Sequence, residues 1–396
     1  MGKDSERIDC TRTRGLERRP AAGAAALLLV ALMVSGCAPE AGDVVVPDPA
    51  PAPVAERAEV RIDNALGGWI PSGVEIAAGD AVALFGDGVV EVGVGSASVA
   101  FGPRYLLWYR VGTDGQVREF AADQEAFTAT ESGELFLAFR PAGFYWSDRR
   151  GTFPAAMLAA PPVPVDMRVE VLRLALPLRD ALTTLADDGE GDAAAALEFL
   201  DNRKQLPAGF EPLWYVTAAD VWADGTVDGR PGIHADTDDD ASIVRMPLDL
   251  PLTDDTTIEF AWRYDAIPAL GPETDAGFHD YLSIAVEFDN GQDLTWIWSR
   301  ELPVGTHFEC PLPGWEGKEY HWVLQSGSEG LGTWFDHERP LLADFRAAIG
   351  GEAPSRIVGV WFIANSQIGR QRGAASFAEV AIVGGGERTE IFAAAP

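Results

Sequence analysis

Short β-prone runs separated by turn residues make up most of this chain, and this spacing limits its fold more than any other feature. The pattern fills residues 58–175 and returns in residues 209–396, for example at 81–85 and 257–264. Runs of four to eight such residues between Gly and Asp turns predict strands, and many short strands in succession favour sandwiches. We therefore expect an all-β protein with two β-sandwich domains of the jelly-roll or galactose-binding type.

A segment between the two β-rich regions has helical spacing instead. Apolar residues repeat at helical intervals in 178–185, and an Asp/Gly-rich break follows. Asp192 is placed to cap a second helix over 193–200. We expect residues 176–208 to form a short helical connector. A further helix should follow Pro340 and end at Gly350, because Pro favours the first turn and Gly the C-terminal end.

The first 36 residues have the arrangement of an export signal. Basic residues precede an apolar run from Ala21 to Val34, which is shorter than the about 20 residues a membrane-spanning helix needs. The run ends in Val34-Ser35-Gly36-Cys37, which resembles the lipobox of bacterial lipoproteins. This resemblance implies a signal peptide over 1–36, acylation of Cys37 and anchoring in the membrane. Residues 37–57, rich in Ala and Pro, then predict an extended tether.

The charge of the chain argues against one class of partner, and its cysteine count argues against an internal disulfide. The chain has 61 acidic and 30 basic residues, a formal net charge of −31, so we expect no nucleic-acid partner. With Cys10 in the signal and Cys37 acylated, Cys310 has no partner for an internal disulfide. No phosphate-binding loop or nucleophile elbow is present in the sequence, which argues against a nucleotide enzyme or a common hydrolase.

The first β-rich region resembles a lectin family. The stretch Gly68-Trp69-Ile70-Pro71-Ser72-Gly73-Val74-Glu75-Ile76, followed by Ala78-Gly79-Asp80, is similar to the opening of LecA-like galactophilic lectin domains. The resemblance implies a β-sandwich over about 58–174. The family's calcium and sugar loop corresponds to residues 140–151, where only Asp148 matches a carboxylate position. Calcium needs six to eight oxygen ligands, so the resemblance supports the fold more than sugar binding.

The second β-rich region resembles the bacterial family called domain of unknown function 3047. The similarity rests on residues 260–265, 282–288 and 296–305, with shorter matches up to Asp344-Phe345-Arg346. It implies a β-sandwich with one helix and assigns no reaction. In a late strand, where an Asp is expected for the family, this chain has Asn365.

Four residues of this region are candidates for acid/base chemistry. His279 and Tyr281 stand at the entrance of a predicted strand, and such a pair suits β-elimination of a polysaccharide. His321, inside a predicted strand, and His307 complete the set. A capped loop around His279 and a hydrogen-bonded structural role for His321 are the alternatives, and both are more common in proteins.

Other residues are candidates for ligand or metal binding. Trp296 and Trp298 share one face of a strand and could stack on sugar rings or pack in the core, whereas Trp315 follows a Pro-Gly turn. Arg263 is a polar candidate from the matched stretch. The acidic run with Asp236, Asp238 and Asp240 could bind calcium, although it lacks the Gly and Glu of an EF-hand. No other cofactor is expected.

The sequence as a whole predicts an exported lipoprotein of the cell envelope that binds carbohydrate. Ala38, rather than Asp, after Cys37 favours the outer membrane in a cell with two membranes. The expected partners are the membrane, through the lipid on Cys37, and a glycan or polysaccharide. Whether the protein is an enzyme stays open, with binding favoured. The alternatives are a polysaccharide lyase or hydrolase, and a structural or protein-binding envelope lipoprotein.

Overall fold

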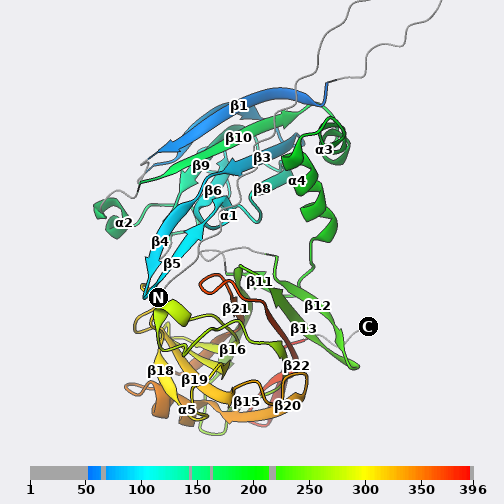
Figure 1. Cartoon of the computed structure of the whole chain (residues 1–396). Helices are drawn as coiled ribbons and strands as arrows, with labels where there is room; N and C mark the ends of the chain where they lie inside the picture. Colours follow the sequence, from blue (N-terminus) through cyan, green and yellow to red (C-terminus); the bar gives the residue numbers. More distant parts are fainter. Residues whose placement is uncertain (1–51, 64–67, 142–144, 161–163, 214–219, 393–396) are drawn as a thin grey trace, which may run out of the picture. The chain divides into compact units, whose positions relative to one another are not determined.

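Strands form most of the protein and are arranged in two successive sandwiches, which confirms the predicted fold class (Figure 1). The computed structural model describes residues 52–63, 68–141, 145–160, 164–213 and 220–392. The predicted signal and Cys37 lie outside these ranges. Residues 51–396 form one compact unit. No helix in the described ranges is both long and apolar enough to cross a bilayer.

The N-terminal sandwich consists of two antiparallel four-stranded sheets and a separate hairpin. The first sheet has the order β1-β10-β3-β8: β1 (Val54–Asp63), β10 (Asp166–Leu174), β3 (Ala81–Asp87) and β8 (Gln124–Thr128). The second has the order β2-β9-β6-β7: β2 (Ile70–Ile76), β9 (Gly133–Phe139), β6 (Leu107–Val111) and β7 (Arg118–Glu119). The hairpin pairs β4 (Val90–Val94) with β5 (Ala97–Phe101).

The core of this sandwich follows from the alternation of side chains along each strand. On β10, Val169 and Val171 are fully buried, whereas Arg168 and Glu170, which alternate with them, are not. On β9 of the other sheet, Leu135 and Leu137 are buried in the same apolar cluster. The two sheets therefore pack face to face over one core.

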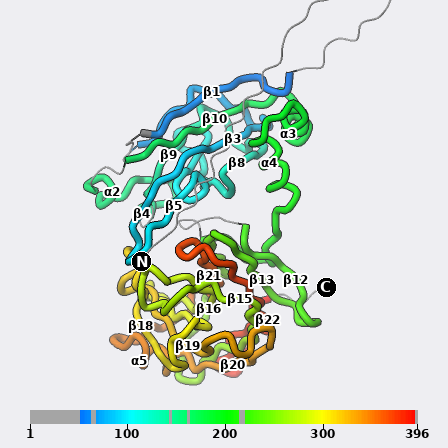
Figure 2. Tube along the Cα trace, in the orientation of Figure 1, coloured from blue at the N-terminus to red at the C-terminus, as the bar shows by residue number. Residues whose placement is uncertain are grey.

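Helices cover the other face of the first sheet and lead to the second sandwich. Residues of α3 (Leu178–Asp187) and α4 (Gly191–Asn202) pack with those of β3, β8 and β10 in a second apolar cluster. Figure 2 shows the two helices as a hairpin beside β8. These helices form the expected connector. The shorter helices are α1 (Pro103–Leu106) and α2 (Ala155–Ala159).

Two local expectations were wrong. The predicted tether extends to residue 57, but β1 begins at Val54, because residues 54–63 pair with β10 and add an edge to the sheet. The β-prone run from Tyr105 to Val111, for which we also expect a strand, begins with a helical turn, since Pro103 at the first helical position starts α1 and β6 begins only at Leu107.

The C-terminal sandwich has a seven-stranded and a six-stranded sheet. The seven-stranded sheet has the order β11-β14-β21-β16-β17-β19-β18: β11 (Glu211–Pro212), β14 (Ala241–Pro251), β21 (Arg356–Asn365), β16 (Tyr281–Phe288), β17 (Asp293–Ser299), β19 (Glu319–Ser326) and β18 (His307–Glu309). The six-stranded sheet holds β12 (Trp222–Val227), β13 (Arg230–Thr237), β22 (Gly373–Gly384), β15 (Thr257–Ala266) and β20 (Trp334–Pro340), with β23 (Glu387–Glu390) on β22. The 3₁₀ turn η1 (Ala276–Phe278) precedes β16, and α5 (Leu341–Ala348) follows β20 as predicted.

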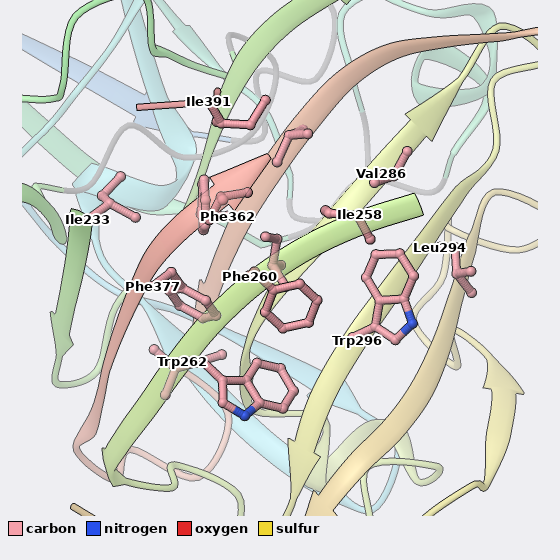
Figure 3. Close-up of a cluster of buried hydrophobic side chains, with 14 of the residues drawn as sticks. Ile233, Ile258, Phe260, Trp262, Val286, Leu294, Trp296, Phe362, Phe377 and Ile391 are labelled. Atoms are coloured by element: carbon pink, nitrogen blue, oxygen red, sulfur yellow. The ribbon is translucent and has the colours of Figure 1, made fainter. Parts of the chain in front are cut away.

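Aromatic rings fill the core between these two sheets. Figure 3 shows Phe260 and Trp262 of β15, Trp296 of β17, Phe362 of β21 and Phe377 of β22 directed into one cluster. Each of these side chains is at most 2% exposed. Aromatic side chains bury large apolar areas, so this cluster is the main stabilising feature of the C-terminal sandwich.

The seven-stranded sheet is also buried on its second face. On β16, Leu282 and Ile284 belong to the central core, whereas Tyr281 and Ala285 belong to a separate cluster. Phe308 and Trp315, from the segment between β17 and β19, pack against this cluster. The second face of the sheet is therefore covered by chain, and polar side chains on it are removed from water.

Candidate functional site

A group of buried polar side chains lies on this second face, and we call it the polar cluster: His279, Tyr281, Cys310, Glu319 and His321. All five are at most 4% exposed. Glu319 and His321 are two residues apart on β19, so their side chains leave the same face of the sheet. His279 and Tyr281 flank the start of β16, and Cys310 follows β18.

The members of the polar cluster are in direct contact. The Tyr281 hydroxyl donates a hydrogen bond to Oε1 of Glu319 at 2.8 Å. Nε2 of His321 lies 3.6 Å from the same oxygen. Sγ of Cys310 lies 3.4 Å from Nε2 of His279. The rings of His279, Tyr281 and His321 are mutually close, with centroids 4.8 to 4.9 Å apart.

Hydrogen bonds from neighbouring segments fix the position of His279. Its Nδ1 is hydrogen-bonded to the backbone carbonyl of Glu273. Because a carbonyl only accepts, the proton is on Nδ1 and the lone pair on Nε2. The side-chain amide of Asn365 donates to the His279 carbonyl at 2.8 Å. Glu273 is itself held, since its carboxylate accepts a bond from the backbone N–H of Arg300 at 2.7 Å.

Burial determines the protonation states in the polar cluster. Desolvation lowers the pKa of His279 to about 3, which keeps the ring neutral. Desolvation, followed by the nearby Glu319 charge, raises the pKa of Tyr281 well above its ordinary value. Burial alone would also raise the pKa of Glu319, but the facing His321 ring and the Tyr281 hydroxyl bring it to about 2. Burial, followed by the charge of Glu319, raises the pKa of the adjacent Asp293 well above its ordinary value.

A cavity of about 440 Å³ adjoins the polar cluster through Tyr281 and Glu319, which both line it. Its volume is within the range of about 300–1,000 Å³ that is usual for small-molecule sites. The remaining lining combines aromatic and aliphatic side chains with a few polar ones: Val92, Val94, Phe101, Tyr105, Arg140, Tyr145, Ile243, Pro311, Leu312, Trp315, Ile363, Asn365, Gln367 and Ile368 are among them. The residues come from both sandwiches.

Close packing brings the β4–β5 hairpin up to the loop of His279. Gly95, in the turn of this hairpin, has φ +55, and a Cβ on it would lie 2.5 Å from the backbone nitrogen of Gly277. Beside Ile368, which also lines the cavity, the Asp280 carboxylate accepts bonds from the backbone N–H groups of Ile368 and Gly369. These contacts hold two walls of the cavity against the segment that carries His279.

The structure brings together three of the four acid/base candidates. His279, Tyr281 and His321 belong to the polar cluster, but His307 does not. The His307 side chain is exposed and its ring packs beside Trp322, with centroids 5.3 Å apart. His307 starts the edge strand β18 opposite Trp322, so its side chain lies away from the polar cluster.

The Trp candidates differ in their surroundings. Trp296 and Trp298 are at most 1% exposed and lie in the central core, as in the packing alternative, because their face of β17 points between the sheets. They are therefore inaccessible to a ligand. Trp315 is half-buried on the cavity wall, and its ring meets that of Tyr145 edge-on at 5.9 Å.

Three of the polar and acidic candidates, Arg263, Asp236 and Asp240, form ion pairs. Arg263 pairs with Asp228 and Asp265, each at 2.7 Å. Asp236 pairs with Arg372 at 2.8 Å. The carboxylate of Asp240 lies 3.3 Å from the guanidinium of Arg104. Calcium binding at Asp236, Asp238 and Asp240 stays a prediction.

Sequence reasoning did not identify Glu319 and Cys310 as site residues. The spacing Glu319-Tyr320-His321, at the start of the strand predicted from Tyr320, was a usable signal, because residues i and i+2 share a face. Cys310 carried no comparable signal, since its loop reaches His279 only in the folded chain.

One family model matches a large part of the second half of the chain. Residues 216–381 match the family model described as "Protein of unknown function (DUF3047)". This match confirms the predicted resemblance for the C-terminal region. The resemblance of the N-terminal region to LecA-like lectins stays a prediction. No curated protein matches the chain.

Several solved structures resemble the chain distantly. The xyloglucanase domain of NopAA, a type three effector from Sinorhizobium fredii, is 11% identical, with a TM-score of 0.26, over 45% of this chain and 99% of that one. An exo-beta-agarase is 9% identical, with a TM-score of 0.26, over 46% of this chain and 24% of that one. The CBM22 tandem domain of Paenibacillus barcinonensis Xyn10C is 10% identical, with a TM-score of 0.22, over 80% of this chain and 85% of that one. Likenesses this distant do not bear on function.

Proposed function

We propose that this protein is a lipid-anchored protein of the cell envelope that binds a carbohydrate in the cavity beside the polar cluster. The observation that carries the proposal is that aromatic rings and buried hydrogen-bonding groups line the same cavity. Sugar rings present apolar C–H faces and polar hydroxyl edges, so their binding sites need both kinds of surface.

Aromatic side chains supply the apolar surface. The half-buried Trp315 and Tyr145 meet edge-on at one wall of the cavity, and Tyr105 contributes to another. Such amphipathic rings suit a ligand that is apolar on one side and polar on the other.

Three polar side chains supply hydrogen bonds to hydroxyl groups. Glu319 lines the cavity as a carboxylate and accepts only. Gln367 also lines it, and its Nε2 is buried without a hydrogen-bond partner. Asn365 is the third. A buried donor without a partner costs about 1–3 kcal/mol, so a ligand hydroxyl that bonds Gln367 would remove this cost.

A neutral sugar fits this site better than an acidic one. The formal net charge of the chain is −31, and the charged side chains that line the cavity, Glu319 and Arg140, have opposite signs, so the cavity offers no excess positive charge to a ligand carboxylate.

Binding is favoured over acid/base catalysis by the protonation states. Catalytic acids and bases work best with pKa values close to the operating pH. The pKa values of His279 and Glu319 are about 3 and about 2, and that of Tyr281 is well above 10. Among the described residues that line the cavity, Glu319 is the single carboxylate, whereas glycoside hydrolysis usually needs two.

A polysaccharide lyase is the second candidate. The Tyr281–Glu319 hydrogen bond at 2.8 Å, on the cavity wall, favours it because a hydroxyl held by a carboxylate can transfer protons. Release of unsaturated products from a polysaccharide, lost in Tyr281→Phe, would support the lyase.

A glycan panel tests the binding proposal. We expect the protein to bind a neutral glycan without releasing products, and Trp315→Ala to weaken binding about tenfold, equal to about 1.4 kcal/mol. Trp334→Ala is the matched control, since Trp334 is also half-buried but lies on β20 of the other sheet. Equal affinity in wild type and Trp315→Ala, with both folded, would contradict the placement of the ligand.

The anchor is tested separately. We expect the wild-type protein to fractionate with membranes and Cys37→Ser to be released into the soluble fraction, because the lipid on Cys37 is the proposed anchor. Membrane association that survives Cys37→Ser would overturn this part of the proposal without affecting the cavity.

A further inference from the structure

Four side chains of the polar cluster are placed as ligands of a metal ion. One ligand atom from each of His279, Cys310, Glu319 and His321 lies within 4.8 Å of the other three. All four residues are buried, and they come from separate segments at β16, β18 and β19. Metal binding by these residues depends on the separations of their ligand atoms, on their hydrogen bonds and on the kinds of ligand atom.

Two of the separations between ligand atoms match the edges of a zinc tetrahedron. Zinc bonds of about 2.0–2.3 Å to N, O and S place neighbouring ligand atoms about 3.3–3.8 Å apart. Cys310 Sγ and His279 Nε2 are 3.4 Å apart, and His321 Nε2 and Glu319 Oε1 are 3.6 Å apart. No separation exceeds 4.8 Å, so binding would require movements of about 1 Å.

His279 already has the orientation of a metal ligand. Nδ1 is bonded to the Glu273 carbonyl, so the lone pair of Nε2 points to the cluster. Metal-bound histidines almost always have such a bond on the other ring nitrogen, because it fixes the tautomer and the ring orientation.

His321 gives an independent indication of a missing partner. Its side chain is fully buried, yet neither Nδ1 nor Nε2 has a hydrogen-bond partner. Buried polar groups in native proteins are nearly always satisfied, and an imidazole left without partners is costly. A metal ion on Nε2 would satisfy this nitrogen with no change of fold.

The donor set indicates the class of metal. One thiolate, two imidazoles and one carboxylate suit Zn²⁺, whereas calcium and magnesium prefer oxygen ligands alone. Ionised Cys310 and Glu319 would together neutralise the two positive charges of the ion. Binding breaks the S–H bond of Cys310, and its proton leaves to solvent as the S–Zn bond forms.

We propose that His279, Cys310, Glu319 and His321 bind one Zn²⁺ ion as a four-coordinate structural site. Cys310 is followed directly by Pro311, Leu312 and Trp315, which line the cavity. The ion therefore ties the Trp315 loop to β16 and β19. Glu319 also lines the cavity, so the two proposals share this residue, but the zinc site does not depend on which ligand the cavity binds.

Metal analysis of the full-length protein in mild detergent tests the proposal. The protein tested carries Cys10→Ser and Cys37→Ser, so that Cys310 is its one thiol. We expect one Zn²⁺ per chain after dialysis, and a thiolate-to-metal charge-transfer band when Co²⁺ replaces it. Cys310→His should keep the ion but lose this band. His321→Gln should weaken Zn²⁺ binding at least about 100-fold, because losing a residue that only hydrogen-bonds to a metal ligand already costs about 10- to 100-fold.

His307→Gln is the matched control, since His307 lies on the neighbouring strand outside the polar cluster. We expect it to bind Zn²⁺ as the parent protein does. A folded parent protein that neither retains Zn²⁺ nor shows the Co²⁺ band would overturn the proposal, as would equal losses in His307→Gln and His321→Gln. Glycan binding by a folded protein that contains no metal would contradict the zinc site but would agree with the proposed function.

Discussion

A single amide links the late strand β21 to the loop that carries His279. Asn365 donates from Nδ2 to the His279 carbonyl at 2.8 Å, in a site that is 9% exposed. An ionised carboxylate at this position has no proton to donate and would face the carbonyl oxygen directly. This geometry explains why an amide is suited to a position where the family resemblance suggested an Asp.

We predict that Asn365→Asp lowers the free energy of unfolding by about 2–3 kcal/mol at neutral pH, the cost of a buried group left without its partner. Urea denaturation measures this change. Asn290→Asp is the control, because Asn290 is exposed in the turn between β16 and β17. A loss below about 0.5 kcal/mol in Asn365→Asp would show that the amide is dispensable.

A second residue makes stability depend on pH. The half-buried ring of His337 packs against Phe260 and Trp262, with centroids 5.0 and 4.8 Å away. Burial, then the charge of Arg339, lowers its pKa to about 4, while Asp336 opposes the shift. Because the folded pKa is below the unfolded value of about 6.5, the unfolded chain binds the proton more tightly.

We therefore predict that His337 destabilises the fold as the pH falls from about 6.5 to about 4, by roughly 1–2 kcal/mol after discounting for solvent screening. His337→Phe should remove this part of the pH dependence. Urea denaturation of both proteins at several pH values across this window measures it. Parallel stability curves for wild type and His337→Phe would refute the assignment.

At the scale of elements, helix α3 contributes to stability through one apolar face. Ala181, Leu182 and Leu185 are at most 4% exposed and pack in the cluster that includes Leu172 of β10. The opposite face carries exposed residues such as Thr183. Packing on the sheet, rather than propensity alone, therefore stabilises this short helix.

We predict that Leu182→Ala lowers the free energy of unfolding by about 2–5 kcal/mol, because it leaves a cavity between helix and sheet. Thr183→Ala, one residue along on the exposed face, should change it by less than about 0.5 kcal/mol. Thermal and urea denaturation compare the two. Similar effects of both substitutions would mean that α3 does not dock on the sheet.

At the scale of the whole molecule, repulsion between acidic groups opposes folding. The formal net charge is −31, and ion pairs such as Arg57–Glu170 and Arg61–Asp166 have partly exposed partners. Exposed pairs contribute little to stability, whereas the repulsion among unpaired carboxylates is spread over the molecule.

We predict that added salt raises the melting temperature by a few degrees between about 10 mM and about 200 mM NaCl, because the screening length falls from about 30 Å to below 10 Å. Calorimetry at several salt concentrations measures this. A melting temperature that falls with salt would show that the ion pairs outweigh the repulsion.

The sequence by itself determined the elements and their class. Alternation of side chains and turn residues predicted strands such as β3, β15 and β16, and helical spacing predicted α3, α4 and α5. These patterns are local, since a strand or a helix is specified by neighbouring residues. For the same reason the sequence could have shown that Glu319 and His321 lie on the same face of a strand.

The site was decided by tertiary structure. Parallel pairing of β17 with β19 places Asp293 opposite Glu319, and the loop after β18 brings Cys310 to His279. The same packing buries Trp296 and Trp298 but leaves Trp315 on the cavity wall. These arrangements depend on which distant strands pair and which face each sheet buries. The residues concerned are far apart in the chain, so no local pattern of amino acids encodes their contacts.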